Sequence, residues 1–333
     1  MKSVRFTAYG SPESVFLADV DVPRPGPREV RIRVESAPLN PSDFMLIDGI
    51  YAYRPPLPSA TGAEGVGTVV ETGDDVTLTA VGDRVLILPS QRQGTWQEEH
   101  VVDERLTVPI KRQVDTDQLA TVGINGATAH LLLRYGGQMA PGTWIAQTAA
   151  NSNVGLFVIA LARKAGLRTL NIVRRSEAVQ PLLDAGADIV LVSGDNLQGE
   201  VAEVLADQRL ALALDGVGGL ATQPLAPFMA REASIVNYAA PSREAVAVHP
   251  MYLNFKNLHV HGFWMHNWLD YAPREEIVQV YDHIIDLVAD GVLSTPIEAR
   301  YDLTDYIRAM THARAVGRHG KILFRPAGTS NAR

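Results

Sequence analysis

The chain has 333 residues, of which 46% are hydrophobic and 20% charged, and it carries a formal net charge of −7 with a pI near 5.7. This acidic balance argues against nucleic acid or an anionic membrane surface as a partner. Because the sequence contains no cysteine, it excludes disulfides, thiolate chemistry and cysteine-based zinc sites. A chain of this length is long for one core and predicts two domains.

No stretch of the sequence is long and apolar enough to span a bilayer. The longest candidate, residues 154–162, stops at Arg163. The first residues, Met1 to Phe6, have the pattern of a β-strand and lack the apolar core of a secretory signal. We therefore expect a cytoplasmic protein without a membrane partner. If a targeting segment has been removed, an organelle matrix is the alternative.

The first third of the chain predicts β-structure. Val30, Ile32 and Val34 alternate with charged residues, which is the period of a half-buried strand. Residues 67–70 and 83–88 continue this pattern after Gly-Asp turn signals. Nine prolines between positions 23 and 89 argue against long helices in this part of the chain.

From about residue 125, apolar strands alternate with helices, which implies a parallel sheet covered by helices on both faces. The predicted strands are 144–149, 169–173, 189–192, 210–214 and 234–238, and the predicted helices are 154–165, 177–185 and 201–206. After residue 264 the pattern predicts two amphipathic helices, 274–289 and 303–315, and a last strand, 321–324.

A turn of small residues joins the predicted strand at 144–149 to the helix that follows. Such a turn lets backbone N–H groups and a helix N-terminus approach a pyrophosphate. We expect Asn153 to replace a glycine here, because Asn accepts left-handed backbone better than other non-glycine residues. An ordinary connection without a ligand is the alternative. The predicted dinucleotide-binding residues of this turn are Asn151, Ser152, Asn153, Val154 and Gly155.

Two arginines follow the second predicted strand of this α/β region. Arg174 lies 19 positions after Gly155, and Arg175 lies 20 positions after it. A residue about 20 positions after the glycine turn meets the adenosine ribose, where an acid favours NAD and an arginine favours the 2′-phosphate of NADP. No acid occupies either position, so the sequence predicts NADPH as the cofactor. Plain surface charges are the alternative interpretation.

The order of these parts resembles the medium-chain dehydrogenase/reductase superfamily over essentially the whole chain. The resemblance implies an α/β fold with a GroES-like β-rich catalytic domain, residues 1–121 with 264–333, and a Rossmann domain with a doubly wound parallel sheet, residues 122–263. Zinc-binding members use a cysteine and a Gly-His-Glu motif. The corresponding stretches here, 39–43 and 61–67, have no cysteine, and Ala63 stands in place of the histidine. We therefore expect no metal.

The segment from Asp43 to Pro58, followed by Gly62-Ala-Glu-Gly-Val-Gly67, resembles the mitochondrial-type 2-enoyl thioester (enoyl-CoA or enoyl-ACP) reductases of fatty acid metabolism. In that family the tyrosine after the glycine is the proton donor, and it matches Tyr51. Tyr53 is the alternative donor. The resemblance implies NADPH-dependent reduction of trans-2-enoyl thioesters, with hydride to the β-carbon and a proton from Tyr51 to the α-carbon.

The same resemblance assigns further residues to the cofactor and the substrate pocket. Asn125 matches an asparagine that faces both, and with Tyr51 and Trp264 it completes the expected catalytic set. Read alone, Asn125 could cap a helix, and Phe263 and Trp264 could be core residues. The further cofactor contacts that the resemblance implies are Arg174, Arg175, Ser176, Tyr238, Ala239, Phe263, Trp264, Met265 and Lys321.

Two other functions remain open at this point. One is a zinc-free quinone or enone oxidoreductase using NADPH, although such relatives generally lack the Tyr51 motif. The other is a cofactor-binding sensor or structural protein with little catalysis. His259, His261 and His266 have neither a cysteine nor an adjacent acid, so we interpret them as residues without a metal. By resemblance we expect a homodimer.

Overall fold

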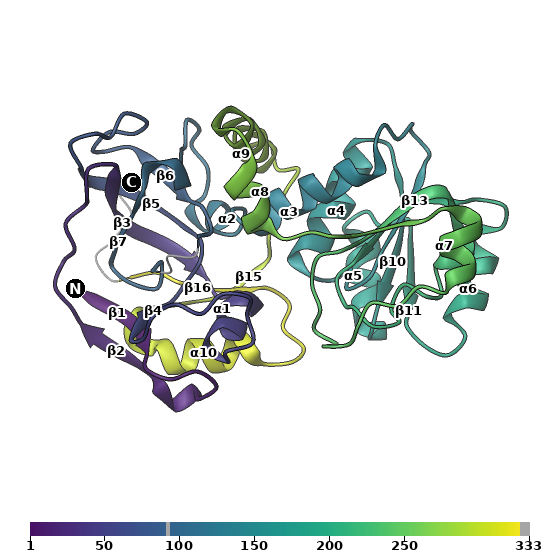
Figure 1. Ribbon diagram of the computed structural model, residues 1–333, viewed down its shortest axis with the longest axis horizontal. Coiled ribbons are helices and arrows are strands. Elements are labelled where there is room, and N and C mark those ends of the chain that lie inside the picture. The colour runs from purple at the N-terminus through teal and green to yellow at the C-terminus, as the bar shows by residue number, and fades with distance from the viewer. Residues whose placement is uncertain (91–93, 327–333) are drawn as a thin grey trace. The chain divides into compact units, whose positions relative to one another are not determined.

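The computed structural model describes residues 1–90 and 94–326 and divides into two compact units (Figure 1). Unit 1 comprises Met1–Ile124 together with the chain from Ala272 onward, and unit 2 comprises Asn125–Tyr271. The sequence placed these boundaries after residue 121 and after residue 263. The chain therefore leaves unit 1 once, after Ile124, and returns to it once.

Unit 1 is a β-rich body with two sheets. Among the described residues, the larger sheet has seven strands in the order β15-β16-β3-β5-β6-β8, with β7 paired to β3, and the smaller sheet has the order β2-β1-β4. The strands are β1 (Lys2–Phe6), β2 (Val15–Asp19), β3 (Glu29–Pro38), β4 (Ser59–Ala60), β5 (Gly65–Thr72), β6 (Arg84–Ile87), β7 (Glu99–Asp103), β8 (Thr107–Pro109), β15 (Ile297–Tyr301) and β16 (Lys321–Phe324).

The core of unit 1 follows the predicted alternation. Val30, Ile32 and Val34 of β3 are fully buried, as expected from the period-two pattern. The last strand, β16, pairs antiparallel with β3 and brings Phe324 opposite Ala37, so the C-terminal segment completes the sheet of the N-terminal segment.

The helices of unit 1 are α1 (Pro41–Ile47), α2 (Thr116–Ala120), α9 (Arg274–Ala289) and α10 (Tyr306–Arg314). The last two agree with the predicted amphipathic pattern. Helix α1 was not predicted, because it lies in a proline-rich stretch. Pro41 occupies its first turn, where the missing N–H costs nothing, and the Asp43 carboxylate accepts the backbone N–H of Asn40 at 2.7 Å.

Unit 2 contains the predicted parallel sheet. Among the described residues it has six strands in the order β11-β10-β9-β12-β13-β14, and every pairing is parallel. This order, in which the sequence runs outward in both directions from β9, is that of a doubly wound sheet. The strands are β9 (Trp144–Gln147), β10 (Arg168–Val173), β11 (Ile189–Val192), β12 (Leu210–Asp215), β13 (Met229–Asn237) and β14 (His259–Gly262).

Helices cover both faces of this sheet. Apolar side chains of α4 and α5 pack with Val173 and Val190 on one face, whereas those of α6 and α7 pack with Leu170 and Ile235 on the other. This arrangement confirms the predicted two-sided cover. The helices of unit 2 are α3 (Asn125–Leu133), α4 (Asn153–Lys164), α5 (Val179–Asp184), α6 (Leu197–Leu205), α7 (Pro250–Lys256) and α8 (Met265–Tyr271).

Some predicted elements of unit 2 differ from the structure in extent. The predicted strand at 234–238 is the second half of the longer β13, and the predicted helix at 177–185 is a 3₁₀ turn followed by α5. Helices α7 and α8 were not predicted. Each has seven residues, about two turns, which is too short for a helical period to be recognised.

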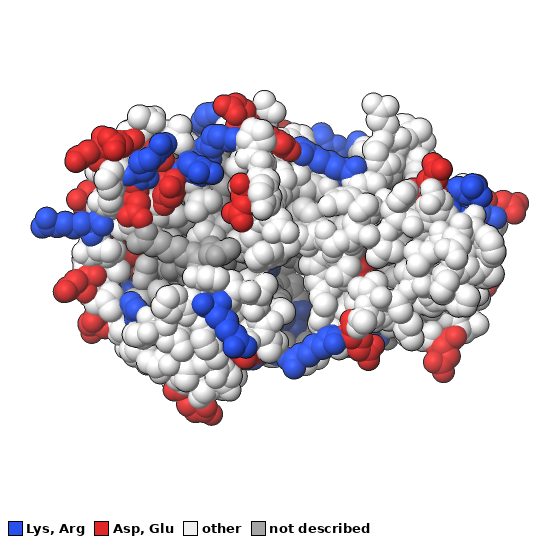
Figure 2. Space-filling model, in the orientation of Figure 1, with Lys and Arg blue, Asp and Glu red and all other residues white. Residues whose placement is uncertain are grey.

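Charged side chains of both signs are interspersed over the face of the molecule shown in Figure 2, and no single-sign patch dominates it. In the part of the chain that the structure describes, no helix has the length and hydropathy needed to cross a membrane.

One buried carboxylate fastens a loop of unit 1 to its sheet. The Glu104 side chain is fully buried and accepts the backbone N–H groups of Thr77 and Leu78 at 2.8 and 2.7 Å. The Arg28 guanidinium lies 3.2 Å from its other oxygen. Burial alone would raise the pKa of Glu104, but these donors and the Arg28 charge outweigh it and lower the pKa below 4.5.

We predict that Glu104→Gln lowers the free energy of unfolding by about 2 kcal/mol at pH 7, because the neutral amide loses the charge interaction and its NH2 group would face either the Arg28 guanidinium or the two backbone N–H donors. A lowered folded-state pKa contributes stability that is present above the unfolded-state pKa and is lost as the pH falls through the folded-state pKa. The difference between Glu104→Gln and wild type should therefore shrink in acid. Urea unfolding across a pH series measures it, and an equal difference at all pH values would contradict an ionic role.

Candidate functional site

The predicted turn after β9 packs closely onto its own strand. The backbone N–H of Gly155 donates to Ser152 Oγ at 3.1 Å, so Ser152 caps helix α4. A side chain at position 155 would place its Cβ 2.3 Å from the carbonyl oxygen of Ala150. Only glycine lets the helix begin this near the end of β9, which is the close approach that a pyrophosphate-binding turn needs.

The residue with left-handed backbone in this turn is not the one that the sequence predicted. Asn153 was expected to tolerate left-handed backbone in place of a glycine. In the structure Asn153 is the first residue of α4, and the left-handed residue is Ala149, with φ of +51°. A non-glycine residue in this region costs free energy and is held by its surroundings. The substitution at 153 therefore leaves the backbone of the turn intact.

A second turn at the same edge of the sheet is held by Asp215, at the end of β12. Its fully buried carboxylate accepts Thr148 Oγ1 at 3.0 Å, the N–H groups of Val217 and Gly218 at 3.0 and 3.1 Å, and Asn237 Nδ2 at 2.9 Å. These bonds connect the ends of β9, β12 and β13. Asp215 therefore has a structural role that fixes the carboxyl edge of the sheet, where ligands bind in such folds.

Three buried side-chain atoms at this edge have no hydrogen-bond partner within residues 1–90 and 94–326. They are Nδ2 of Asn153, the phenol oxygen of Tyr238, and the acceptor Oε1 of Gln147 at the end of β9. Burial raises the pKa of Tyr238 to about 12, an effect that nearby Ser152 partly offsets. Buried polar atoms are normally paired, so the unpaired donors of Asn153 and Tyr238 at a helix N-terminus fit a bound group that supplies acceptors. The phosphate oxygens of a dinucleotide have this chemistry.

The structure places Arg174 and Arg175 directly after β10, with Arg174 exposed and Arg175 half-buried. Within the described part of the chain, neither guanidinium has an acidic or hydrogen-bonding partner. Arg168, at the opposite end of β10, is paired with Asp188 at 2.6 Å. Two uncommitted cations at the carboxyl end of the second strand fit a ribose 2′-phosphate. Ser176, which follows them, is exposed.

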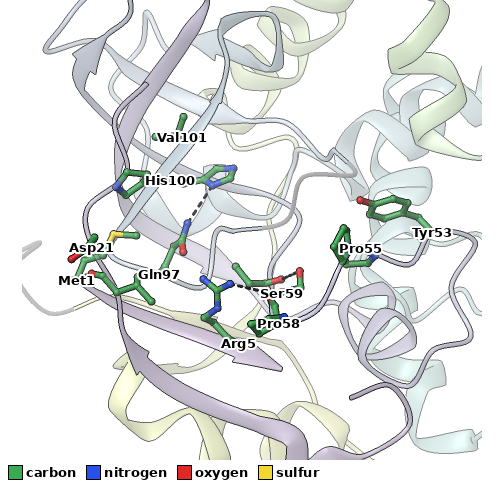
Figure 3. A pocket seen from close by; sticks show the side chains of 14 residues that line it. Met1, Arg5, Asp21, Tyr53, Pro55, Pro58, Ser59, Gln97, His100 and Val101 are labelled. Carbon is green, nitrogen blue, oxygen red and sulfur yellow. Dashed lines mark hydrogen bonds between the residues drawn. The ribbon is translucent and has the colours of Figure 1, made fainter. Parts of the chain in front are cut away.

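Tyr51 and Tyr53 both lie in unit 1, in the segment after α1, and both are half-buried against its core. They differ in what they face. Tyr53 lines a cavity of about 620 Å³, beside Pro55, and Tyr51 is not among the lining residues (Figure 3). Arg5 and His100 lie on the other side of this cavity. The choice between the two tyrosines as proton donor therefore stays a prediction.

Lys321 lies in a buried polar cluster of unit 1. Its ammonium donates to Oδ1 of Asn40, and Nδ2 of Asn40 donates to Oε1 of Glu64 at 2.7 Å. Burial raises the pKa of the Asp43 and Glu64 carboxyls to about 7 each and lowers the pKa of Lys321 to about 8. The predicted contact of Lys321 with the cofactor stays a prediction.

Sequence reasoning missed Glu64 and Asn40 as members of this cluster. Both lie in the stretches that correspond to the zinc motifs, and a glutamate at the start of a glycine-rich buried strand was the available signal.

The remaining predicted residues lie in unit 2. Asn125 begins α3 and is buried, whereas Ala239 follows Tyr238 and is half-buried. Phe263 donates its backbone N–H to Asn237 at 2.8 Å and so continues the edge of the sheet beyond β14. The Trp264 ring lies 4.9 Å from the ring of His266, and Met265 is buried. The roles of these side chains at the site stay predictions.

The histidines that the sequence raised as possible metal ligands lie on β14 and α8. The rings of His259 and His261 stack at 6.0 Å on the exposed edge strand β14, and burial lowers the pKa of His266. Among the described residues, no group of three or more His, Cys, Asp or Glu side chains is placed to hold a metal ion.

Comparison with known proteins gives two family matches and several whole-length relatives. The alcohol dehydrogenase GroES-like domain matches residues 26–112, and the zinc-binding dehydrogenase domain matches residues 153–283. The mitochondrial enoyl-[acyl-carrier-protein] reductase of Xenopus tropicalis is 35% identical, over 92% of this chain and 89% of that protein. The solved quinone oxidoreductase of Pseudomonas syringae is 27% identical with a TM-score of 0.88, over 98% of this chain and 99% of that one. A mycobacterial protein solved with NADPH is 25% identical with a TM-score of 0.87, over 98% and 100% of the two chains.

Proposed function

The chain belongs to the medium-chain dehydrogenase/reductase superfamily, in its zinc-free enoyl reductase branch, and we propose that it reduces trans-2-enoyl thioesters to saturated acyl thioesters with NADPH. The observation that carries the proposal is the Tyr51 segment. It follows α1 in the β-rich unit, its tyrosine is half-buried against the core, and its sequence resembles that of enoyl thioester reductases. The whole-length match to enoyl-[acyl-carrier-protein] reductases supports the same substrate class.

In the proposed reaction the protein orients the substrate and the cofactor and supplies one proton. When bound, NADPH supplies the hydride for the β-carbon of the substrate. The enolate that develops spreads its charge onto the thioester carbonyl, and the Tyr51 phenol donates a proton to the α-carbon. The phenolate then regains a proton from water. Asn125 and Trp264 shape the pocket around the reacting atoms.

The chain binds a nicotinamide cofactor, and we infer a preference for NADPH over NADH from the charges at the end of β10. The support is that Arg174 and Arg175 have no partner within the described residues, whereas Arg168 of the same strand is paired. A 2′-phosphate would give both guanidinium groups a charge-assisted hydrogen bond.

We predict that Tyr51→Phe lowers kcat for crotonyl-CoA about 10²-fold or more while leaving the Kd of NADPH within about twofold, because only the proton donor is removed. NADPH consumption and fluorescence titration measure the two quantities. Tyr53→Phe is the matched control and should keep most of the activity. If Tyr53→Phe loses the activity and Tyr51→Phe keeps it, the donor is Tyr53.

We predict that replacing both Arg174 and Arg175 with alanine raises the KM for NADPH about 10- to 100-fold and leaves the KM for NADH nearly unchanged, since only NADPH carries the 2′-phosphate. Initial rates with each cofactor measure this. Arg168→Ala, at the other end of β10, is the control that should not alter the preference. An equal loss with both cofactors would contradict the assignment.

A quinone or enone reductase is the second candidate, favoured by the solved quinone oxidoreductase that covers the whole chain. Enoyl-CoA and enoyl-ACP substrates of two chain lengths, compared with a simple quinone, separate the two activities. Turnover of the quinone alone would reject the thioester proposal and the role of Tyr51, while leaving the cofactor assignment standing.

We further propose a homodimer formed along β14. Among the described residues β14 is one of the two edge strands of the parallel sheet, the other being β11, and Val260 on β14 is 45% exposed, as expected for an edge that a second copy covers. We predict twice the chain mass in light scattering, and a lower mass for Val260→Lys. A monomer at micromolar concentration would contradict the proposal. The protein is proposed to act in the cytoplasm or in an organelle matrix.

A further inference from the structure

The peptide between Gly123 and Ile124 is the last one in unit 1 before the chain enters unit 2, and it is hydrogen-bonded on both sides. Its N–H, on Ile124, donates to Oε2 of Glu64 at 2.6 Å. Its carbonyl, on Gly123, accepts the phenol O–H of Tyr281 at 2.6 Å. Glu64 and Tyr281 are both fully buried. Two side chains that are buried away from water therefore fix the orientation of this peptide plane.

The approach of Glu64 requires the glycine. A Cβ at position 123 would lie 2.8 Å from Oε2 of Glu64, so any other residue would push the carboxylate away. The other carboxylate oxygen accepts Asn40 Nδ2, and the orientation of that amide is set in turn because Asn40 Oδ1 accepts the Lys321 ammonium. Hydrogen-bond donation thus runs from Lys321 through Asn40 to one oxygen of Glu64, and the other oxygen of Glu64 accepts the Ile124 N–H.

The residue after Ile124 is Asn125, the first residue of α3 and of unit 2. Its position depends on the backbone dihedrals that directly precede it. We propose that Glu64 is a positioning residue: by holding the Ile124 N–H it fixes the start of α3 and thereby the side chain of Asn125. This proposal rests on the proposed function only in giving Asn125 a contact with the cofactor.

The test measures cofactor affinity, so it requires no turnover. Titration of wild type with NADPH and with NADH selects the cofactor that binds more tightly, and its Kd is then measured for Glu64→Gln, Asn125→Ala and the double variant. Glutamine keeps the volume but can accept only one of the two N–H bonds. We expect Glu64→Gln to raise the Kd about 5- to 10-fold, since small displacements at a binding group have large effects.

Two further results decide between positioning and general destabilisation. In the Asn125→Ala background, Glu64→Gln should raise the Kd less than twofold, because the group through which it acts is gone. The matched control is Glu104→Gln, which alters another fully buried glutamate that accepts backbone N–H groups. It should lower stability and leave the Kd unchanged.

Several outcomes would overturn the proposal. They are an unchanged Kd in Glu64→Gln, an effect that persists in full without the Asn125 side chain, and an equal effect of Glu104→Gln. If Glu64→Gln does not fold, Tyr281→Phe removes the bond on the other side of the same peptide and should raise the Kd in the same direction. Failure of the enoyl reductase proposal would look different: normal cofactor binding and normal coupling, with no turnover of any enoyl thioester.

Discussion

Buried carboxylates that have acquired hydrogen-bond donors from distant segments organise unit 1. An ionised carboxylate without donors is costly inside a protein, so each one requires that other parts of the chain come to it. Glu104 takes backbone donors from the loop after β5, and Asp117 takes Arg300 and Arg325 from the C-terminal segment. Glu64 takes one donor from the stretch before α1 and one from the end of unit 1. Apolar packing alone would leave these connections less specific.

Buried polar groups also lie at the carboxyl edge of the sheet in unit 2, but only some of them have hydrogen-bond partners. Asp215 satisfies its donors and ties three strand ends together. Beside it, Asn153 and Tyr238 each keep a buried atom without a partner among the described residues, and Ala149 holds a left-handed conformation. Unpaired buried polar atoms and left-handed backbone lower stability, and they are typical of sites where a bound ligand compensates for that loss. The contrast separates the groups that support this edge from the groups that we propose contact the dinucleotide.

The parts of the fold that the sequence predicted are those whose signal is local. The parallel sheet follows from apolar strands that alternate with helices, and the buried face of β3 follows from alternation within one strand. Helices α1, α7 and α8 have too few turns to show a period. The conformation of Asn153 depended on where the helix begins, which composition does not specify. Glu64 was missed because its partners lie 24 and 60 positions away along the chain.

The position of Glu64 connects this architecture to the chemistry. Glu64 follows Ala63, which occupies the position of a histidine ligand in zinc-dependent relatives. The two carboxylate oxygens of Glu64 accept N–H groups from Asn40 and Ile124. Reduction of a C=C bond conjugated to a carbonyl tolerates this change, because the developing negative charge is delocalised onto the substrate's own oxygen. The rate of such a reaction depends on accurate placement of the groups that contact the substrate and the cofactor. A carboxylate that fixes a peptide plane is suited to that requirement.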